Sequence, residues 1–215
     1  MRLPHHPDAL DRLRVPSEDE PLRVLVSACL LGHGCTTDGT DSGMGQALGD
    51  LLSLPTLRVI PFCPEHHGIG TPRGMPDIHG GVGEDVLDGR ARVYDEHGED
   101  LTAGMLEGAE AMLATARAHA AELAILVDMS ASCGSQVISD GCRLVPDRRY
   151  RAGVGVATAL LLRHGIPVVS QRDHRTLQRL RARWQPGFVV DPAARDHHES
   201  DWFRGYFRGY FRNGG

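Results

Sequence analysis

The sequence predicts an α/β protein: a three-layer sandwich with a short, mostly parallel sheet, of the Rossmann- or flavodoxin-like kind. Short, continuous apolar runs rich in branched residues are typical of parallel strands that are buried on both faces. Such runs occur at 22–28, 57–62, 123–127 and 166–170. Helical patterns lie between them, so strand and helix alternate along the chain, as in a parallel sheet covered by helices on both faces.

The expected helices lie between the apolar runs. Each shows apolar residues at helical spacing or a residue typical of a helix end, such as Pro55 or Gly165. In the longest of them, Asp100 or Thr102 is the expected cap, and a core stripe repeats every three or four residues. That stripe consists of Leu106, Ala109, Leu113, Ala116 and Ala120. The expected helices are 44–54, 102–120, 153–164 and 174–184.

The glycine-rich stretches are expected to form loops and hairpins. Residues 31–43 and 66–83 are predicted loops, long enough to wrap around a ligand. The dipeptides Asp88-Gly89 and Asp140-Gly141 are typical of tight turns. We therefore expect small hairpins at 86–94 and 136–145.

Size and composition limit the class of protein. A chain of 215 residues with 41% apolar content is long enough for one α/β domain. The net charge of −5 gives no electrostatic case for nucleic acid, and the absence of lysine excludes Schiff-base chemistry and a Walker-type phosphate loop. With no apolar run near the roughly 20 residues of a membrane span, and no signal-peptide segment, we expect a cytoplasmic protein with no membrane partner.

Three segments are distinguished by composition. Residues 1–20 form a polar, loosely packed lead-in, 21–185 the α/β domain, and 186–215 a C-terminal extension. The extension repeats Phe-Arg-Gly-Tyr and is expected to be disordered, although arginine and aromatic residues together also suit single-stranded nucleic acid. Within it, residues 195–201 are expected to be solvated surface.

Three cysteines follow three of the apolar runs. Cys29, Cys63 and Cys133 each stand just beyond an expected strand. Because parallel strands end at the same edge of a sheet, we expect the three thiols to converge where α/β proteins bind ligands. Five cysteines are odd in number and too few for a disulfide scaffold, so catalysis or metal binding is favoured.

Three cysteines at one sheet edge permit several interpretations. They could hold an iron–sulfur cluster through three irons and leave the fourth iron open, hold zinc with an open position, or act as redox or nucleophilic thiols. Buried cysteines are also simply small apolar residues. The absence of a Cys-x-x-Cys pair disfavours a ferredoxin-type cluster and a zinc ribbon.

Polar neighbours of the cysteines supply candidate catalytic groups. Glu65 lies two residues beyond Cys63, close enough to act as a general acid or base. Ser130 and Ser132 precede Cys133, and their hydroxyls could orient or protonate a substrate. Arg73 could bind a substrate carbonyl or phosphate, or form a surface salt bridge.

An ordered set of motifs resembles a known family. The motifs are Val26-Ser-Ala-Cys-Leu-Leu-Gly, Cys63-Pro-Glu, Thr71-Pro-Arg, 89–102 and Ser130-Ala-Ser-Cys-Gly-Ser. Together they cover about residues 22–172 and resemble the "domain of unknown function 523" family, which includes bacterial thiouracil desulfidases. This chain departs from the family in two places. It has Cys35-Thr-Thr-Asp38-Gly39 where many relatives carry Cys-Arg-Tyr-Asp-Gly, and Ala131 where a proline is usual.

The resemblance implies a 4Fe-4S cluster held by Cys29, Cys63 and Cys133, whose open iron takes sulfur from a thiolated pyrimidine. It also implies that Glu65 and one serine of the pair Ser130 and Ser132 handle protons while water attacks the thiocarbonyl carbon and hydrosulfide leaves. The expected substrate-binding residues are Cys35, Asp38 and Arg73.

The leading hypothesis is a non-redox desulfidase for a 2-thiouracil-like nucleobase or a similar small thiocarbonyl compound. The alternative is a non-catalytic iron–sulfur or metal-binding module that senses iron or redox state or transfers sulfur. A zinc hydrolase that uses the same cysteines is a third interpretation.

Overall fold

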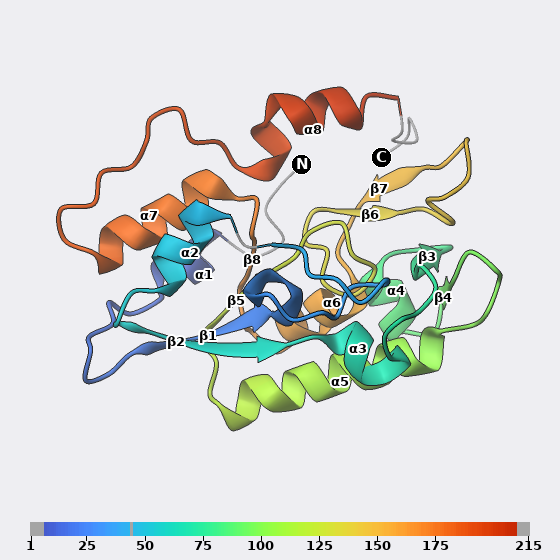
Figure 1. Ribbon diagram of the computed structural model, residues 1–215, viewed down its shortest axis with the longest axis horizontal. Coiled ribbons are helices and arrows are strands. Elements are labelled where there is room, and N and C mark those ends of the chain that lie inside the picture. The colour runs from blue at the N-terminus through green and yellow to red at the C-terminus, as the bar shows by residue number, and fades with distance from the viewer. Residues whose placement is uncertain (1–6, 44, 210–215) are drawn as a thin grey trace.

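A four-stranded parallel sheet lies at the centre of the computed structural model, which describes residues 7–43 and 45–209 (Figure 1). Its strands are β1 (Leu22–Ser27), β2 (Leu57–Phe62), β5 (Leu123–Leu126) and β8 (Val168–Ser170), in the order β2-β1-β5-β8. Each strand lies within one of the four expected apolar runs. Helices cover both faces, so the prediction of a three-layer α/β sandwich with a short parallel sheet is confirmed.

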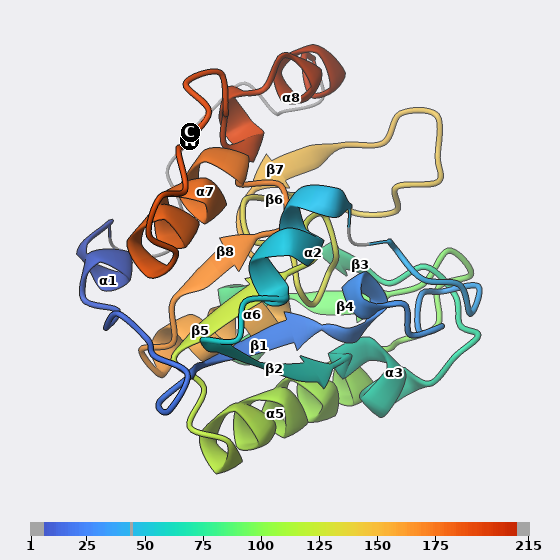
Figure 2. The same cartoon turned by 60° about the vertical axis from the view of Figure 1, so that its left-hand side comes forward.

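Both faces of the sheet are buried because successive side chains of a strand point to opposite sides. In β1, Val24 and Val26 face one core and Leu25 faces the other. The first core is completed by α1 (Pro7–Asp11), α2 (Gln46–Leu52) and α7 (His174–Trp184), and the second by α4 (Gly83–Leu87), α5 (Thr102–Ala118) and α6 (Val156–Arg163). Figure 2 shows α5 below the sheet, with α2 and α7 above it.

The long helices agree with the expected ones. Helices α5, α6 and α7 form within their expected ranges, and α2 begins at Gln46; the expected start of that helix, Met44, lies outside the described residues. The prediction that Ala120 belongs to the core stripe is wrong, because this residue lies beyond the end of α5, has a φ of 48° and is exposed. Within the described part of the chain, each helix is too short or too polar to cross a bilayer.

The stretch 66–94 differs from the expectation of a loop followed by a hairpin. It contains most of α3 (Pro64–Ile69), then β3 (Asp77–His79), α4 and β4 (Arg92–Tyr94), and β3 pairs with β4 in antiparallel register. The Asp85 carboxylate accepts a hydrogen bond from the Val82 N–H at 3.0 Å, which caps the start of α4. Gly89, with a φ of 73°, therefore follows a helix end and is not a hairpin turn.

The second expected hairpin has a different partner strand. β6 (Val137–Ser139) pairs with β7 (Tyr150–Ala152), so residues 140–149 form a long connection and 142–145 is not a strand. The buried carboxylate of Asp77 explains the difference. It accepts hydrogen bonds from the Ser139 hydroxyl of β6 at 2.5 Å, from the backbone N–H of Arg143 at 2.7 Å and from the Arg143 guanidinium at 2.5 Å. Arg143 is thereby held on Asp77 of β3 and does not pair with β6 as a strand.

The C-terminal segment is ordered in its described part, which corrects the expectation of disorder for residues 186–209. It contains η2 (His197–Glu199) and α8 (Asp201–Tyr206). Phe203 and Phe207 are buried against Tyr150. Asp196 and His197, expected on solvated surface, are also buried. Residues 210–215, with the last part of the aromatic repeat, lie outside the described residues.

The N-terminal lead-in also contacts the domain. Leu10 of α1 is buried in the core beside α7, and the Arg14 guanidinium lies 2.7 Å from the Glu122 carboxylate. Residues 1–6 lie outside the described residues. The division at residues 20 and 185 stays a prediction.

Helix α3 packs directly on the backbone of α5. A Cβ atom added to Gly68 would stand 1.8 Å from the Gly104 carbonyl oxygen, and one added to Gly108 would stand 2.0 Å from the carbonyl oxygen of Pro64. Only glycine allows two backbones to approach so closely. The position of α3, which follows Cys63 and contains Glu65, is therefore set by glycines in a different helix.

Substituting Gly108 tests this contact. Gly108→Ala is expected to destabilise the protein by about 1–3 kcal/mol, since the added methyl group meets backbone that cannot rotate away. Gly205→Ala is the matched control: Gly205 lies within α8, where an added Cβ meets open space, so its change should stabilise by about 0.4–1 kcal/mol. Urea denaturation followed by tryptophan fluorescence measures both. A loss of less than 0.5 kcal/mol in Gly108→Ala, on the order of an exposed surface substitution, would refute the tight contact.

Candidate functional site

A cavity of about 300 Å³ opens at the carboxyl edge of the sheet. The loops that follow β1, β2 and β5 all contribute to it, and the three cysteines expected to converge line it together. Its polar and sulfur-bearing lining includes Cys29, Cys35, Cys63, Glu65, Arg73, Asp128, Ser130, Ser132, Cys133, Arg143 and Arg172. All five cysteines of the chain are free thiols.

Cys29 and Cys63 are each held by a short helical turn that begins where a strand ends. Cys29 lies in η1 (Ala28–Leu31), which ends at Gly32 with a φ of 84°. Cys63 is the N-cap of α3, and its thiol accepts a hydrogen bond from the His66 N–H at 3.4 Å. Pro64 occupies the first position of α3, where its fixed φ favours a helix start. The sequence Cys-Pro-Glu thus places a thiol at the helix start and a carboxylate in its first turn.

Cys133 lies in a tight turn between β5 and β6. The Ser130 hydroxyl oxygen accepts hydrogen bonds from the backbone N–H groups of Ser132 at 3.0 Å and Cys133 at 2.9 Å. The Ser132 hydroxyl donates to the Cys133 sulfur at 3.4 Å. Gly155 supports the turn from behind, because a Cβ at that position would stand 2.5 Å from the Ser132 backbone. Glycine is therefore required at position 155 for the turn to pack against it.

Glu65 contacts two other residues that line the cavity, Ser130 and Arg73. One carboxylate oxygen accepts a hydrogen bond from the Ser130 hydroxyl at 2.6 Å, and the other lies 2.6 Å from an Arg73 guanidinium nitrogen. The side chains of Arg73 and Glu65 are only 5% and 11% exposed. The hydroxyl proton of Ser130 therefore points to a buried, paired carboxylate.

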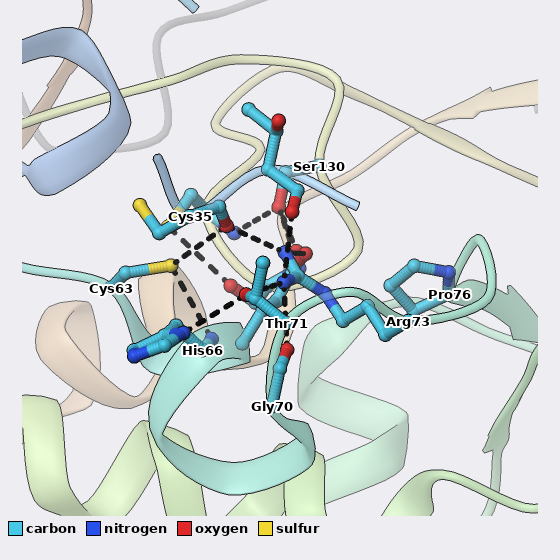
Figure 3. A network of polar contacts seen from close by, with 12 residues as sticks. Cys35, Cys63, His66, Gly70, Thr71, Arg73, Pro76 and Ser130 are labelled. Atoms are coloured by element: carbon cyan, nitrogen blue, oxygen red, sulfur yellow. Dashed lines mark hydrogen bonds and ion pairs between the residues drawn. The ribbon is translucent and has the colours of Figure 1, made fainter. Parts of the chain in front are cut away.

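Arg73 is a central member of the network in Figure 3. Besides Glu65, its guanidinium donates to the Cys35 carbonyl at 3.1 Å, the Gly70 carbonyl at 2.9 Å and the Thr71 hydroxyl at 2.9 Å. Most of its donors are thus engaged by the protein itself. Arg73 ties the loop of Cys35 to the residues after α3 and holds Glu65 in place.

Burial raises the pKa of three of the cavity thiols and so favours their protonated form. Loss of solvent raises the pKa of Cys29 and of Cys133 above the ordinary value. It also raises the pKa of Cys35 to about 12, with a further contribution from the neighbouring Cys63. A thiol that binds a metal ion loses its proton, because the positive charge of the metal reverses the effect of burial.

The donor set fits an iron–sulfur cluster. Thiolates are the ligands that such clusters take, and Cys29, Cys63 and Cys133 come from three separate loops around one cavity. In the described ranges, no three His, Cys, Asp or Glu side chains gather closely enough to bind a single metal ion. A cluster instead takes one thiolate at each of three irons, so its ligands stand apart around a shared volume.

Of the three residues expected to bind substrate, Cys35 and Arg73 line the cavity and Asp38 does not. Cys35 is buried and lines the cavity, as does Arg73. Asp38 does not line it: this residue lies on an exposed turn, where hydrogen bonds from the Thr40 and Thr36 hydroxyls lower the pKa of its carboxyl to about 2. Cys142 lines a separate depression together with Asp140 and Val145.

Sequence reasoning missed three charged residues of the cavity. Asp128 and Arg172 stand just after β5 and β8, so the rule that found the cysteines would also have found them. Arg143 could not be found that way, because it reaches the cavity from the long connection between β6 and β7. Its guanidinium donates to the Met129 carbonyl at 2.8 Å.

The fold and site define an α/β protein with thiols and a hydrogen-bonded carboxylate–hydroxyl pair at the carboxyl edge of its sheet. The model of the 2-thiouracil desulfurase family matches residues 24–173, and the chain belongs to that family. The resemblance to the "domain of unknown function 523" family is thereby confirmed, since that family includes the thiouracil desulfidases. The family indicates a desulfidase enzyme.

Two relatives extend this comparison. The uncharacterized protein YbbK of Bacillus subtilis (strain 168) is 36% identical over 151 residues, which cover 70% of this chain and 96% of YbbK. A solved structure of the 4Fe-4S-dependent thiouracil desulfidase TudS is 38% identical, with a TM-score of 0.58. That match covers 69% of this chain and 90% of TudS.

The buried Glu65–Arg73 pair yields a stability prediction. Arg73→Met should cost about 3–5 kcal/mol, because it leaves the Glu65 carboxylate buried without its cation. The double variant Arg73→Met with Glu65→Gln should recover part of that loss, and a double-mutant cycle from urea denaturation measures the coupling. Arg90→Met is the control: the Arg90 side chain is 61% exposed beside Asp85, so its loss should cost less than about 1 kcal/mol. Strict additivity in the cycle would contradict the coupling.

A cluster of buried carboxylates lies beside the cavity. The pKa of Asp173 is raised to about 7, chiefly by burial. The neighbouring charges of Asp196 and Asp128 contribute to the increase, and the hydrogen bond from the His197 N–H opposes it. For Asp128, burial also raises the pKa, but the hydrogen bond and charge of His197 outweigh it and leave the pKa below the ordinary value.

The raised pKa of Asp173 predicts a pH-dependent stability. The folded protein keeps a proton that the unfolded chain has released, so this contribution is complete below about pH 4 and is lost as the pH rises to about 7. Asp173→Asn should remove that decline, a difference on the order of 2–4 kcal/mol between pH 4 and 8. Urea denaturation at several pH values measures it, with Glu107→Gln, an exposed change on α5, as the control. Parallel curves for Asp173→Asn and the parent protein would disprove the assignment.

Proposed function

We propose that this protein removes sulfur from a thiolated nucleobase of the 2-thiouracil kind, using a 4Fe-4S cluster held by Cys29, Cys63 and Cys133. The reaction converts the thiocarbonyl to a carbonyl with one water molecule and releases hydrogen sulfide, so no electrons are gained or lost. The observation that carries the proposal is the meeting of three thiols with the Glu65–Ser130 pair in one cavity. Membership of the family and the likeness to TudS support it.

When bound, the cluster would supply a Lewis-acidic iron that accepts the sulfur of the substrate. Cys29, Cys63 and Cys133 would hold such a cluster as thiolates from three loops, and one iron would have no protein ligand. The hydroxyl of Ser132 donates to the sulfur of Cys133, and hydrogen bonds of this kind tune the cluster.

Glu65 is the proposed general base. Its carboxylate takes a proton from water as the water oxygen forms its bond to the substrate carbon, and it returns a proton to the leaving sulfur. Arg73 keeps that carboxylate paired and oriented through a 2.6 Å contact. Because most of its donors are engaged within the protein, we assign Arg73 to positioning Glu65 in preference to the substrate binding expected for it.

Ser130 is the serine proposed to move protons. Its hydroxyl donates to Glu65, whereas the hydroxyl of Ser132 faces the sulfur of Cys133. Two backbone N–H groups fix the Ser130 oxygen, so the hydroxyl has one orientation toward the carboxylate. Cys35 lines the same cavity from the loop that follows β1, and it is the proposed substrate contact there.

The first experiment is anaerobic reconstitution with iron and sulfide. The protein should gain the broad visible absorbance of thiolate-to-iron charge transfer, with about four irons per chain, and Cys133→Ala should not retain it. Reconstituted protein should then release sulfide from 2-thiouracil. A protein that stays colourless and binds stoichiometric zinc would refute the proposal in favour of zinc chemistry.

Glu65→Gln separates an enzyme from a non-catalytic cluster protein. An enzyme should keep its cluster absorbance and lose turnover by about 100-fold or more, since general acid–base catalysis contributes about that much. A sensor or sulfur-transfer module should release no sulfide catalytically in either form. The exposed change Glu107→Gln is the matched control and should leave turnover intact.

A further inference from the structure

The C-terminal segment rests against the site although it lies beyond the family match. That match ends at residue 173, and the segment in question contains η2 and α8. In Figure 1 the red α8 lies along one side of the molecule near β6 and β7, and Phe203 and Phe207 are buried against Tyr150 of β7. The segment is therefore anchored on the same part of the fold that follows Cys133.

One side chain of this segment reaches the loop that carries the site. His197 Nδ1 lies 2.7 Å from Asp128 Oδ2, and the two side chains are 2% and 0% exposed. Trp202 stacks on the imidazole ring with centroids 5.6 Å apart, and Phe203 meets it edge to face at 4.8 Å. The backbone N–H of His197 donates to Asp173 at 3.1 Å. The ring is thus fixed by packing and by hydrogen bonds.

The second oxygen of Asp128 holds both ends of the Ser130–Cys133 turn. Asp128 Oδ1 accepts hydrogen bonds from the N–H groups of Met129 at 2.9 Å and Ser135 at 2.9 Å, with Gln136 further away at 3.4 Å. Met129 has a φ of 63°, a left-handed conformation that a residue with a side chain adopts only when its surroundings enforce it. Asp128 is therefore the residue that closes this turn.

We propose that His197 is a positioning residue: by holding Asp128 it fixes the turn that places the Ser130 hydroxyl on Glu65 and the Cys133 thiol in the cavity. The proposal deepens the proposed function and rests on it for the roles of Ser130 and Cys133. Hydrogen bonds to a charged, buried group are stronger than neutral ones, and breaking this one leaves an Asp128 oxygen buried without its partner. The site of this protein is thus completed by a segment outside the family domain.

Hydrogen exchange on the metal-free, full-length protein tests the positioning directly. In His197→Leu, which keeps apolar bulk but loses the hydrogen bond, the amides of Met129 and Ser135 should exchange about tenfold faster. His197→Asn keeps a donor toward Asp128 and should restore most of the protection. Phe207→Leu changes the packing of the same segment without touching Asp128, and should leave both amides as they are.

Two results of that experiment would overturn the proposal. One is unchanged exchange at Met129 and Ser135 in His197→Leu. The other is an equal acceleration in Phe207→Leu, which would mean that the segment acts by general packing alone. If His197→Leu does not fold, His197→Phe takes its place, because it keeps a ring between Trp202 and Phe203 but has no donor for Asp128. Unchanged exchange at Met129 and Ser135 in His197→Phe would overturn the proposal in the same way.

A second measurement uses the protein after iron and sulfide reconstitution. His197→Leu should lose iron to a chelator about tenfold faster, and its kcat should fall while its KM for 2-thiouracil stays near that of the parent protein. A rate of iron loss and a kcat equal to those of the parent protein would contradict the positioning role of His197. If the parent protein takes up no iron, the proposed function fails, while the exchange experiment still decides whether His197 positions the turn.

Discussion

The parallel register of β1, β2 and β5 is the constraint on which the site depends. Ser27 at the end of β1 stands beside Phe62 at the end of β2, and Val26 pairs with Ile125 of β5. Neighbouring strands lie about 4.8 Å apart, so the residues that follow them enter the same small volume. A slip of one residue would turn every side chain of a strand to the opposite face, and two buried cores prevent it. The hydrophobic pattern of the strands thereby fixes where the thiols stand.

The position of Glu65, the proposed general base, depends on a second contact of a different kind. Glu65 lies on α3, whose backbone rests on Gly104 and Gly108 of α5. Arg73 then joins Glu65 to the loop of Cys35. The sheet therefore places the sulfur atoms, while a helix–helix contact and one buried ion pair place the carboxylate. Both sets meet at Ser130, which contacts Glu65 and the backbone of Cys133.

The sequence was sufficient to predict the four strands of the central sheet, the longer helices and the meeting of Cys29, Cys63 and Cys133. These features follow from local patterns together with one rule of α/β topology. The pairing of β3 with β4, and of β6 with β7, could not be predicted from local patterns. The buried Asp77 carboxylate binds Ser139 and Arg143, which are distant in the sequence, and the Asp85 carboxylate caps a helix, α4, inside the segment expected to form a hairpin. The ordered structure of residues 186–209, which were expected to be disordered, was not predicted for a related reason. A repeat of aromatic and arginine residues is typical of a disordered segment. Here Phe203 and Phe207 of the repeat pack on Tyr150, a contact that the local sequence does not reveal.

The stacking of Trp202 has an optical consequence. The chain has two tryptophans, and this one lies between His197 and Tyr206, with the Arg172 guanidinium 4.9 Å from its ring centroid. Arg172 also lines the cavity, so the indole is one side chain away from it. Its emission should be quenched by energy transfer to any chromophore that occupies the cavity. The fluorescence of Trp202 should therefore report the state of the site. It should also report whether the C-terminal segment is packed on the domain, because the indole stacks on His197.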